Sequence, residues 1–161
     1  KQPVSAYITN ANTIALNADS KKKSSMTATT ILYLAHSNQV IFNNPHINIT
    51  TAQGIKWIIT AEKALSNKQG TSITLIHNVR LHQPPQNKHP DTTIKTEKLF
   101  YDKKKNIAYN HALTHVHQPG IFASGQGITV DFNTNTIKIR SKSRGAYVPQ
   151  KISHSKQNQT K

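Results

Sequence analysis

Apolar side chains recur at every second position along much of the chain, and this period places them on one face of an extended strand. Between Ile73 and His82 the odd positions carry Ile, Leu, His, Val and Leu, whereas most even positions are polar. The same alternation occurs in four shorter stretches, which are residues 13–17, 46–50, 128–133 and 136–140. Each stretch predicts a half-buried β-strand with one apolar face.

Polar clusters separate these stretches and predict turns or loops. The segment Thr60–Leu65 could form one helical turn, but it is too short for a helix of about ten residues or more. Strands and turns thus follow one another about every ten residues, which favours an all-β fold of many short antiparallel strands. The predicted turns are Ala18–Ser25, Gln83–Thr93, Asp102–Asn106 and Asn133–Asn135.

The chain of 161 residues is expected to form one domain. Its last segment, residues 150–161, has a single aliphatic side chain among polar and basic ones, so nothing attaches this segment to a core. We therefore expect a β domain over residues 1–149 and a disordered polar tail over residues 150–161.

The alternation does not decide what the apolar faces cover. A β-sandwich would join two such faces in a dry core, whereas a partly open β-jellyroll would present them to an apolar ligand. Hydrophobic residues make up 35% of the chain, which is below the roughly 45–50% of an average domain. A packed core and a lined groove are both compatible with this pattern.

The charge of the chain changes the range of expected partners. Lys and Arg total 21 against 6 Asp and Glu, which gives a formal net charge of +15. The cations are dispersed among turns and no nucleic-acid-binding motif is present, so nucleic acid is not the expected partner. Anionic lipid phosphates would be attracted by the same charge. We interpret Lys21–Lys23 and Lys103–Lys105 as solvated turn residues.

Candidate chemistry is sparse. The chain has no cysteine, which excludes disulfides and thiolate sites. His111, His115 and His117 would share one face of a regular strand, but we interpret them as surface histidines because few carboxylates are available to orient a metal site. No acidic pair has the apolar setting of a general acid, and the glycines of residues 125–127 lack the context of a nucleotide loop. We expect neither an enzyme nor a cofactor.

An ordered series of segments covers most of the chain. The series begins with a hairpin-like stretch at Ser5–Thr29 and ends with RGAY at Arg144–Tyr147. Between them lie VIFNNPHINI (Val40–Ile49), GIKWIITAEKALS (Gly54–Ser66), ITLIHNVRLH (Ile73–His82), TTIKTEKLFYD (Thr92–Asp102) and SGQGITVDFNTNTIKI (Ser124–Ile139). Taken together, these segments resemble the periplasmic domain of the LptC family over residues 5–148. The segment His115–Ser124 departs from the family pattern.

This resemblance implies a twisted, boat-like antiparallel β-jellyroll that carries lipopolysaccharide. It also implies a place at the periplasmic face of the inner membrane of a Gram-negative cell, with an N-terminal transmembrane anchor that this chain lacks. In that role the domain would accept lipopolysaccharide from the LptBFG transporter and pass it to LptA. An LptA-like periplasmic bridge protein is one alternative. A scaffold that joins sheets without carrying lipid is another.

The resemblance also assigns roles to particular residues. Under this resemblance, the side chains that the alternation places on apolar strand faces would line the acyl groove. These side chains are Phe42, Ile47, Ile49, Trp57, Ile59, Ile73, Leu75, Val79, Leu81, Ile128, Val130 and Phe132. Ile137, Ile139 and Tyr147 become the edge that faces LptA, because unpaired edge strands recruit another sheet. A homodimer through the edge strands would use the same principle.

Overall fold

A computed structural model of the chain describes residues 4–16, 23–140 and 144–147. Within these ranges every regular element is a β-strand, which confirms the predicted all-β fold, and none is a helix long and apolar enough to cross a membrane. The strands are β1 (Val4–Leu16), β2 (Lys23–Leu34), β3 (Gln39–Asn43), β4 (His46–Thr50), β5 (Lys56–Thr60), β6 (Lys63–Asn67), β7 (Ser72–Gln83), β8 (Thr92–Asp102), β9 (Ile107–Gln118), β10 (Ile121–Asp131), β11 (Thr136–Ile139) and β12 (Arg144–Tyr147).

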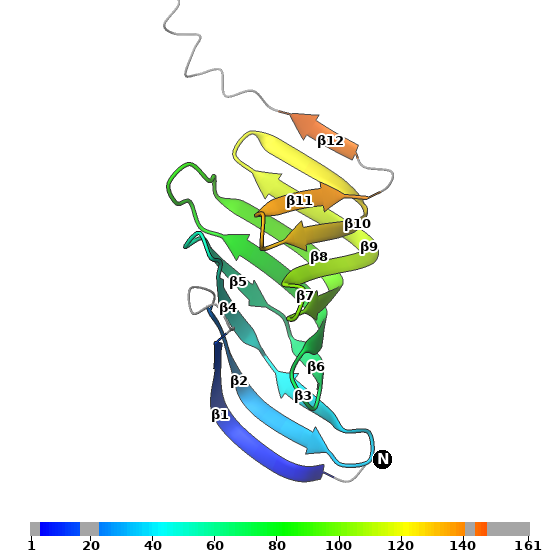
Figure 1. Cartoon of the computed structure of the whole chain (residues 1–161). Coiled ribbons are helices and arrows are strands. Elements are labelled where there is room, and N and C mark those ends of the chain that lie inside the picture. The colour runs from blue at the N-terminus through cyan, green and yellow to red at the C-terminus, as the bar shows by residue number, and fades with distance from the viewer. Residues whose placement is uncertain (1–3, 17–22, 141–143, 148–161) are drawn as a thin grey trace, which may run out of the picture.

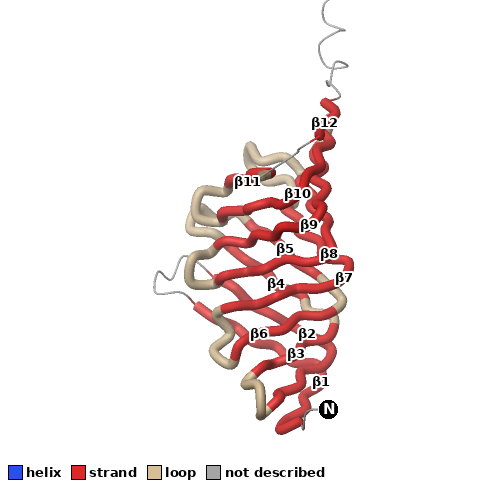
Figure 2. Tube along the Cα trace, turned by 90° about the vertical axis from the view of Figure 1, so that its right-hand side faces the viewer, coloured by secondary structure: helices blue, strands red, loops and turns tan. Residues whose placement is uncertain are grey.

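All twelve strands pair antiparallel in one sheet. Ten of them follow the order β11-β10-β9-β8-β7-β5-β4-β2-β3-β6, and β6 also pairs with β7. Off this path, β1 pairs with β2 and β12 pairs with β10. The long strands bend midway, so their two halves belong to two walls. One wall contains β3, β6 and β11, and we call it the β3–β6 wall. The other contains β4, β5 and β12, and we call it the β4–β5 wall. Figures 1 and 2 show the strands stacked along the long axis of the molecule.

The bends form a row that joins the two walls, which we call the spine. Asn44 (φ 51°) separates β3 from β4, and His77 (φ 71°) and Asn78 (φ 50°) interrupt the pairing of β7 with β8. Asn tolerates this left-handed conformation better than most residues. The Asn44 N–H donates to the Glu62 carbonyl at 2.8 Å, and the Glu62 N–H donates to the His77 carbonyl at 3.0 Å.

At the next bend, the side chain of Asn110 replaces part of the strand pairing. The ladder between β8 and β9 is interrupted between Thr96 and Phe100. Asn110 is 1% exposed, and its Nδ2 donates to the Lys98 carbonyl at 2.9 Å while its Oδ1 accepts from the Ile128 N–H at 3.0 Å. A buried backbone group without a partner is costly, so this asparagine lets three strands bend together.

Opposite the spine, both walls end in loops. The predicted turns at Gln83–Thr93, Asp102–Asn106 and Asn133–Asn135 are confirmed within one residue or two. The turn predicted at Ala18–Ser25 extends too far, because β2 begins at Lys23. Thr60–Leu65 is not helical, since β5 ends at Thr60 and β6 begins at Lys63. The predicted tail lies outside the described residues.

One apolar cluster fills the space between the walls, and we call it the interior cluster. Ile59, Leu75, Leu81, Ile94 and Phe132 are all fully buried in it. Alternation explains this placement, because every second side chain of each strand faces the same side. One prediction was wrong at the spine: His77 continues the odd-numbered face of β7, yet its positive φ turns it outward and leaves it exposed.

Candidate functional site

The side chains predicted to line a groove all lie in the interior cluster. Each of the twelve is buried, with exposed fractions between 0% and 8%. They come from β3, β4, β5, β7, β10 and the turn after β10, so residues as distant in sequence as Phe42 and Phe132 share one interior. Their contact with a ligand stays a prediction.

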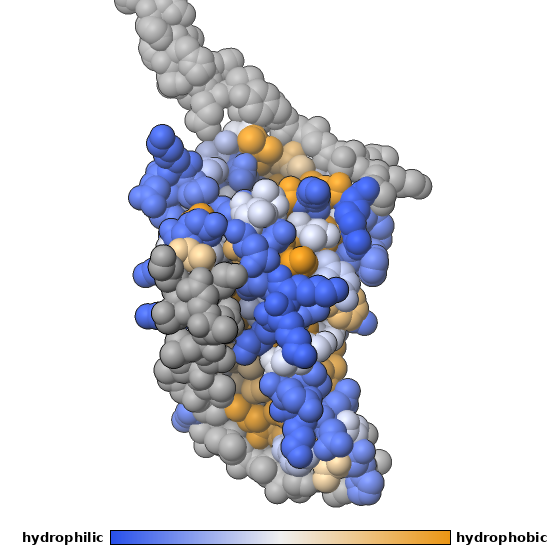
Figure 3. Space-filling view, viewed as in Figure 1, coloured by the Kyte–Doolittle hydropathy of each residue, from blue (hydrophilic) through white to orange (hydrophobic). Residues whose placement is uncertain are grey.

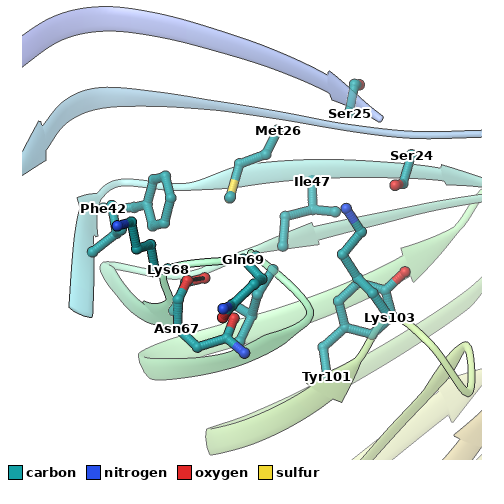
Figure 4. A pocket seen from close by; sticks show the side chains of 14 residues that line it. Ser24, Ser25, Met26, Phe42, Ile47, Asn67, Lys68, Gln69, Tyr101 and Lys103 are labelled. Atoms are coloured by element: carbon teal, nitrogen blue, oxygen red, sulfur yellow. Dashed lines mark hydrogen bonds between the residues drawn. The ribbon is translucent and has the colours of Figure 1, made fainter. Parts of the chain in front are cut away.

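A cavity of about 270 Å³ opens into this cluster between β2 and β4 of one wall and β3 and the β6–β7 turn of the other. We call it the mouth cavity (Figure 4). Its apolar lining consists of Met26, Val40, Phe42, Ile47, Ile73 and Tyr101. An apolar cavity edged by a few polar groups is the usual form of a small-molecule site.

Two lysines stand at the edge of the mouth cavity. Lys103 is half-buried, and this burial lowers the pKa of its ammonium group. Its backbone N–H donates to the Thr71 carbonyl at 2.9 Å. The second, Lys68, lines the same cavity as Phe42 (Figure 4), and its Nζ lies 6.0 Å from the ring centroid of Tyr33. Lys104 and Lys105 are exposed as expected, and Lys103 lies in the predicted turn but is half-buried rather than fully solvated.

The turn that carries Lys68 is held in a fixed shape. The Asn67 Oδ1 accepts the backbone N–H of Thr71 at 2.9 Å, and the Asn67 Nδ2 donates to the Thr71 hydroxyl at 2.8 Å. Asparagine side chains stabilise turns in this way. On the opposite side of the opening, Ser24 and Ser25 of β2 add hydroxyl groups to the edge.

A second cavity, of about 400 Å³, lies at the other end of the interior, and we call it the terminal cavity. Ile137 and Ile139 of β11 face Val116 of β9 across it, and Trp57 also contributes to its lining. Its remaining lining is mostly polar, from Gln83, His89, Pro90, Thr92, Gln118 and Asn135. The two cavities therefore differ, since the mouth cavity is largely apolar and the terminal cavity combines apolar and amide side chains.

The two walls end in short strands next to the terminal cavity. β11 pairs with residues 128–131 of β10, and β12 pairs with residues 121–124. Among the described strands, nothing pairs with the outer edge of β11 or of β12. Ile137 and Ile139 pack against the interior cluster, so a partner of this edge would meet the backbone of β11.

Several members of the cluster were not predicted from the sequence. Ile94, Leu99 and Tyr101 of β8 are all buried, but the parity of buried positions changes from even to odd between Thr96 and Leu99. The irregular pairing at that point causes the change. Met26 and Val40 were not predicted, because apolar and polar residues alternate only weakly in their strands. Only the pairing register of these strands indicates that the two side chains face the interior.

The histidines lie outside this interior. His111, His115 and His117 are exposed on the outer face of β9, as interpreted from the sequence. His117 packs against Phe122, with ring centroids 4.4 Å apart. The described residues contain no group of three or more His, Cys, Asp or Glu placed to hold a metal ion. The departing segment His115–Ser124 forms the hairpin between β9 and β10, where Phe122 lies opposite His117.

Polar side chains cover most of the face shown in Figure 3, and apolar side chains are visible near both ends of the molecule. Leu113, Ile121 and Phe122 are the exposed large apolar residues among those described. The other large apolar side chains whose burial is described are buried or half-buried.

The chain matches the family model "LptC: Lipopolysaccharide-assembly, LptC-related" over residues 1–148. Among solved structures it is similar to that of LptH, "the LptA homologous periplasmic component of the conserved lipopolysaccharide transport device from Pseudomonas aeruginosa". The two chains are 13% identical with a TM-score of 0.55, over 92% of this chain and 96% of that one. This likeness shows the shared fold, which confirms the expected β-jellyroll. No curated protein sequence matches the chain.

Proposed function

The chain belongs to the LptC-related family of lipopolysaccharide-assembly proteins, and from this membership we propose that its interior carries the acyl chains of lipopolysaccharide. In this role the domain accepts lipopolysaccharide from the LptBFG transporter at the inner membrane. It then passes the lipid to an LptA-type protein in the periplasm. The observation that carries the proposal is the apolar cluster that runs between the walls and opens at the mouth cavity.

Burial of acyl chains would provide the binding energy. Each buried CH₂ group contributes about 0.8 kcal/mol, so a few acyl chains suffice for tight binding. The mouth cavity, at about 270 Å³, is slightly smaller than the usual range for small-molecule sites. A lipid with several acyl chains therefore enters by separating the loops opposite the spine, where Met26 and Ile47 of one wall face the β6–β7 turn of the other.

The edge of the mouth cavity suits the phosphates of lipid A. Lys68 and Lys103 stand beside the apolar lining, so a phosphate could contact an ammonium group while the acyl chains lie inside. An ionised partner strengthens a hydrogen bond. Partial burial disfavours the charged form of Lys103, and a phosphate would offset that cost. The net charge of +15 would also draw the anionic lipid toward the domain.

The unpaired edges provide the proposed route onward. An LptA-type protein would add its sheet to the edge formed by β11 and β12, which includes Ile137, Ile139 and Tyr147. The transporter would meet the opposite edge, at β1. A homodimer through these edges would block one of the two contacts.

Photocrosslinking at neighbouring positions of β4 tests the carrier proposal. Ile47 lines the mouth cavity, whereas Asn48, the next residue, is exposed on the outer face. A photoreactive amino acid at position 47 should capture purified lipopolysaccharide saturably, and the same group at position 48 should not. Circular dichroism of both variants controls for folding.

The opposite results identify the alternatives. Equal capture at positions 47 and 48 would mean that lipopolysaccharide adheres to the surface. No capture at either position, with an LptA-type protein still bound, would favour a scaffold that joins sheets without carrying lipid. The complete burial of most of the interior cluster is the observation that favours this second candidate.

A further inference from the structure

The turn between β10 and β11 bridges the two walls, and we call residues 132–135 the latch. Asn135 lies at its tip. Its Oδ1 accepts the indole N–H of Trp57 at 2.8 Å, and its Nδ2 lies 3.0 Å from Gln83 Oε1 and 3.3 Å from His89 Nδ1. All three partners belong to the β4–β5 wall or its loops, whereas the latch extends from the β3–β6 wall.

A second contact anchors the latch from the opposite wall. The Nε2 of Gln53, in the β4–β5 loop, donates to the Asn133 carbonyl at 3.0 Å. Within the β3–β6 wall, the Phe132 N–H donates to the Asn106 carbonyl at 3.0 Å, and the Asn133 Nδ2 donates to the Lys105 carbonyl at 2.9 Å. Hydrogen bonds to the Asn106 and Lys105 carbonyls thus attach the latch to the β3–β6 wall, and side-chain hydrogen bonds join it to the β4–β5 wall across the gap.

Phe132 extends from the latch into the interior. It is fully buried, and its ring centroid lies 5.6 Å from that of Trp57 and 5.9 Å from that of Tyr101, with both pairs edge to face. Tyr101 lines the mouth cavity, and Trp57 lines the terminal cavity. The three rings therefore form a continuous row from one cavity to the other, with Phe132 in the middle.

We propose that the latch divides the interior into two lipid-binding compartments, and that an acyl ligand reaches the terminal cavity only when Asn135 releases the β4–β5 wall. The inference rests on the proposed function and adds a retention step to it. The acyl chains are first held at the mouth cavity. They then advance once the latch swings outward and removes Phe132 from between the rings of Tyr101 and Trp57.

The chemistry of the latch suits a reversible step. Its polar contacts across the gap are side-chain hydrogen bonds, and such bonds are individually weak in net terms because water can replace them. The other contact across the gap is the packing of Phe132 against Trp57. Apart from Phe132, the latch consists of half-buried and exposed residues in a short turn, and such segments open locally more easily than core strands. The turn can therefore open while both walls stay folded.

Trp57 reports the state of the latch directly, because it is the only tryptophan in the chain. Asn135→Ala removes the acceptor of its indole N–H, so its fluorescence emission should shift to longer wavelength as water reaches the ring. Thr134→Ala is the matched control, since Thr134 is exposed and, among the described residues, its hydroxyl has a hydrogen bond only with Thr136. An unshifted emission in Asn135→Ala would contradict the latch.

Crosslinking in each compartment tests the division itself. A photoreactive amino acid at Ile73 reports on the mouth cavity and one at Ile139 reports on the terminal cavity. With purified lipopolysaccharide, Asn135→Ala should raise the ratio of capture at Ile139 to capture at Ile73 by roughly tenfold, because it removes all three contacts of Asn135 at once. Thr134→Ala should leave the ratio unchanged.

A tether provides the opposite perturbation. The chain has no cysteine, so the double variant Gln53→Cys, Asn133→Cys can be joined by a short bismaleimide that fixes the latch to the opposite wall. The tethered protein should keep capture at Ile73 and lose it at Ile139. Equal ratios in all variants would overturn the latch while the carrier proposal stands. No capture at either position would overturn both.

Discussion

Tyr101 shows how burial at the mouth cavity sets the behaviour of a single side chain. Its ring is 3% exposed, and its hydroxyl lies 3.4 Å from the Oδ1 of Asn106. Burial, followed by the charge of Asp102, raises the pKa of this phenol well above its ordinary value of 10.0. Folding therefore favours the neutral form of the Tyr101 phenol.

The raised pKa predicts a pH dependence of stability. Below pH 10 the phenol is protonated in both the folded and the unfolded chain, so its contribution is fully present. Above that value the unfolded chain releases the proton first, and the free energy of unfolding falls as pH rises. Tyr101→Phe should reduce this fall, as measured by urea denaturation at about pH 8 and about pH 11. An identical fall in both proteins would contradict the assignment.

At the scale of the strands, the spine depends on residues that accept unusual backbone geometry. Gly127, in β10, has φ +98°, and a Cβ at this position would lie 3.3 Å from the Asn110 carbonyl oxygen and 3.4 Å from the Arg140 Nε. The pairing of β10 with β9 is irregular at the same point. Glycine is therefore required by conformation and by close approach.

Replacement of this glycine should separate the two requirements. Gly54→Ala is the matched control, because Gly54 has φ +83° but a Cβ at this position would have no neighbouring atom within 4 Å. It should cost about 1–2 kcal/mol from backbone strain alone, whereas Gly127→Ala should cost about 1–3 kcal/mol more from overpacking. Urea denaturation measures both losses. Equal losses would mean that the approach of β9 and Arg140 does not constrain the bend.

The same bends explain what the sequence could and could not predict. Short strands such as residues 46–50 were predicted because their alternation is uninterrupted. The long strands β7 and β8 were harder to interpret. In β7 the irregularity at His77 turns one side chain outward, and in β8 the irregularity near Thr96 moves the buried positions from even to odd numbers. Alternation identifies a face only between two bends, and it contains no direct signal for the bends themselves.

The candidate site was predicted to a similar extent. The alternation of apolar and polar positions was sufficient to select twelve side chains that share one interior, because each lies in a locally regular stretch. It could not identify Lys103, whose position over the mouth cavity depends on the packing of the β8–β9 turn beside Thr71. Nor could it identify the latch, because the bond from Trp57 to Asn135 joins residues 78 positions apart.

At the scale of the whole molecule, one sheet forms two walls, one interior and two free ends. The spine holds the walls together along one side, and the loops opposite it meet through few side-chain contacts, of which those of the latch are the best defined. This asymmetry allows the interior to open without loss of strand pairing. Lipid carriage needs such an opening, because most side chains of the interior cluster are shielded from solvent.

The central claim is that lipopolysaccharide enters this closed interior, and Ile59 tests it most directly. Ile59 is fully buried in β5, whereas Lys56 on the same strand is exposed. With a photoreactive amino acid at each position in turn, the account predicts saturable capture of purified lipopolysaccharide at position 59 and none at position 56. Capture at position 56 alone, or at neither position by a folded protein, would contradict it.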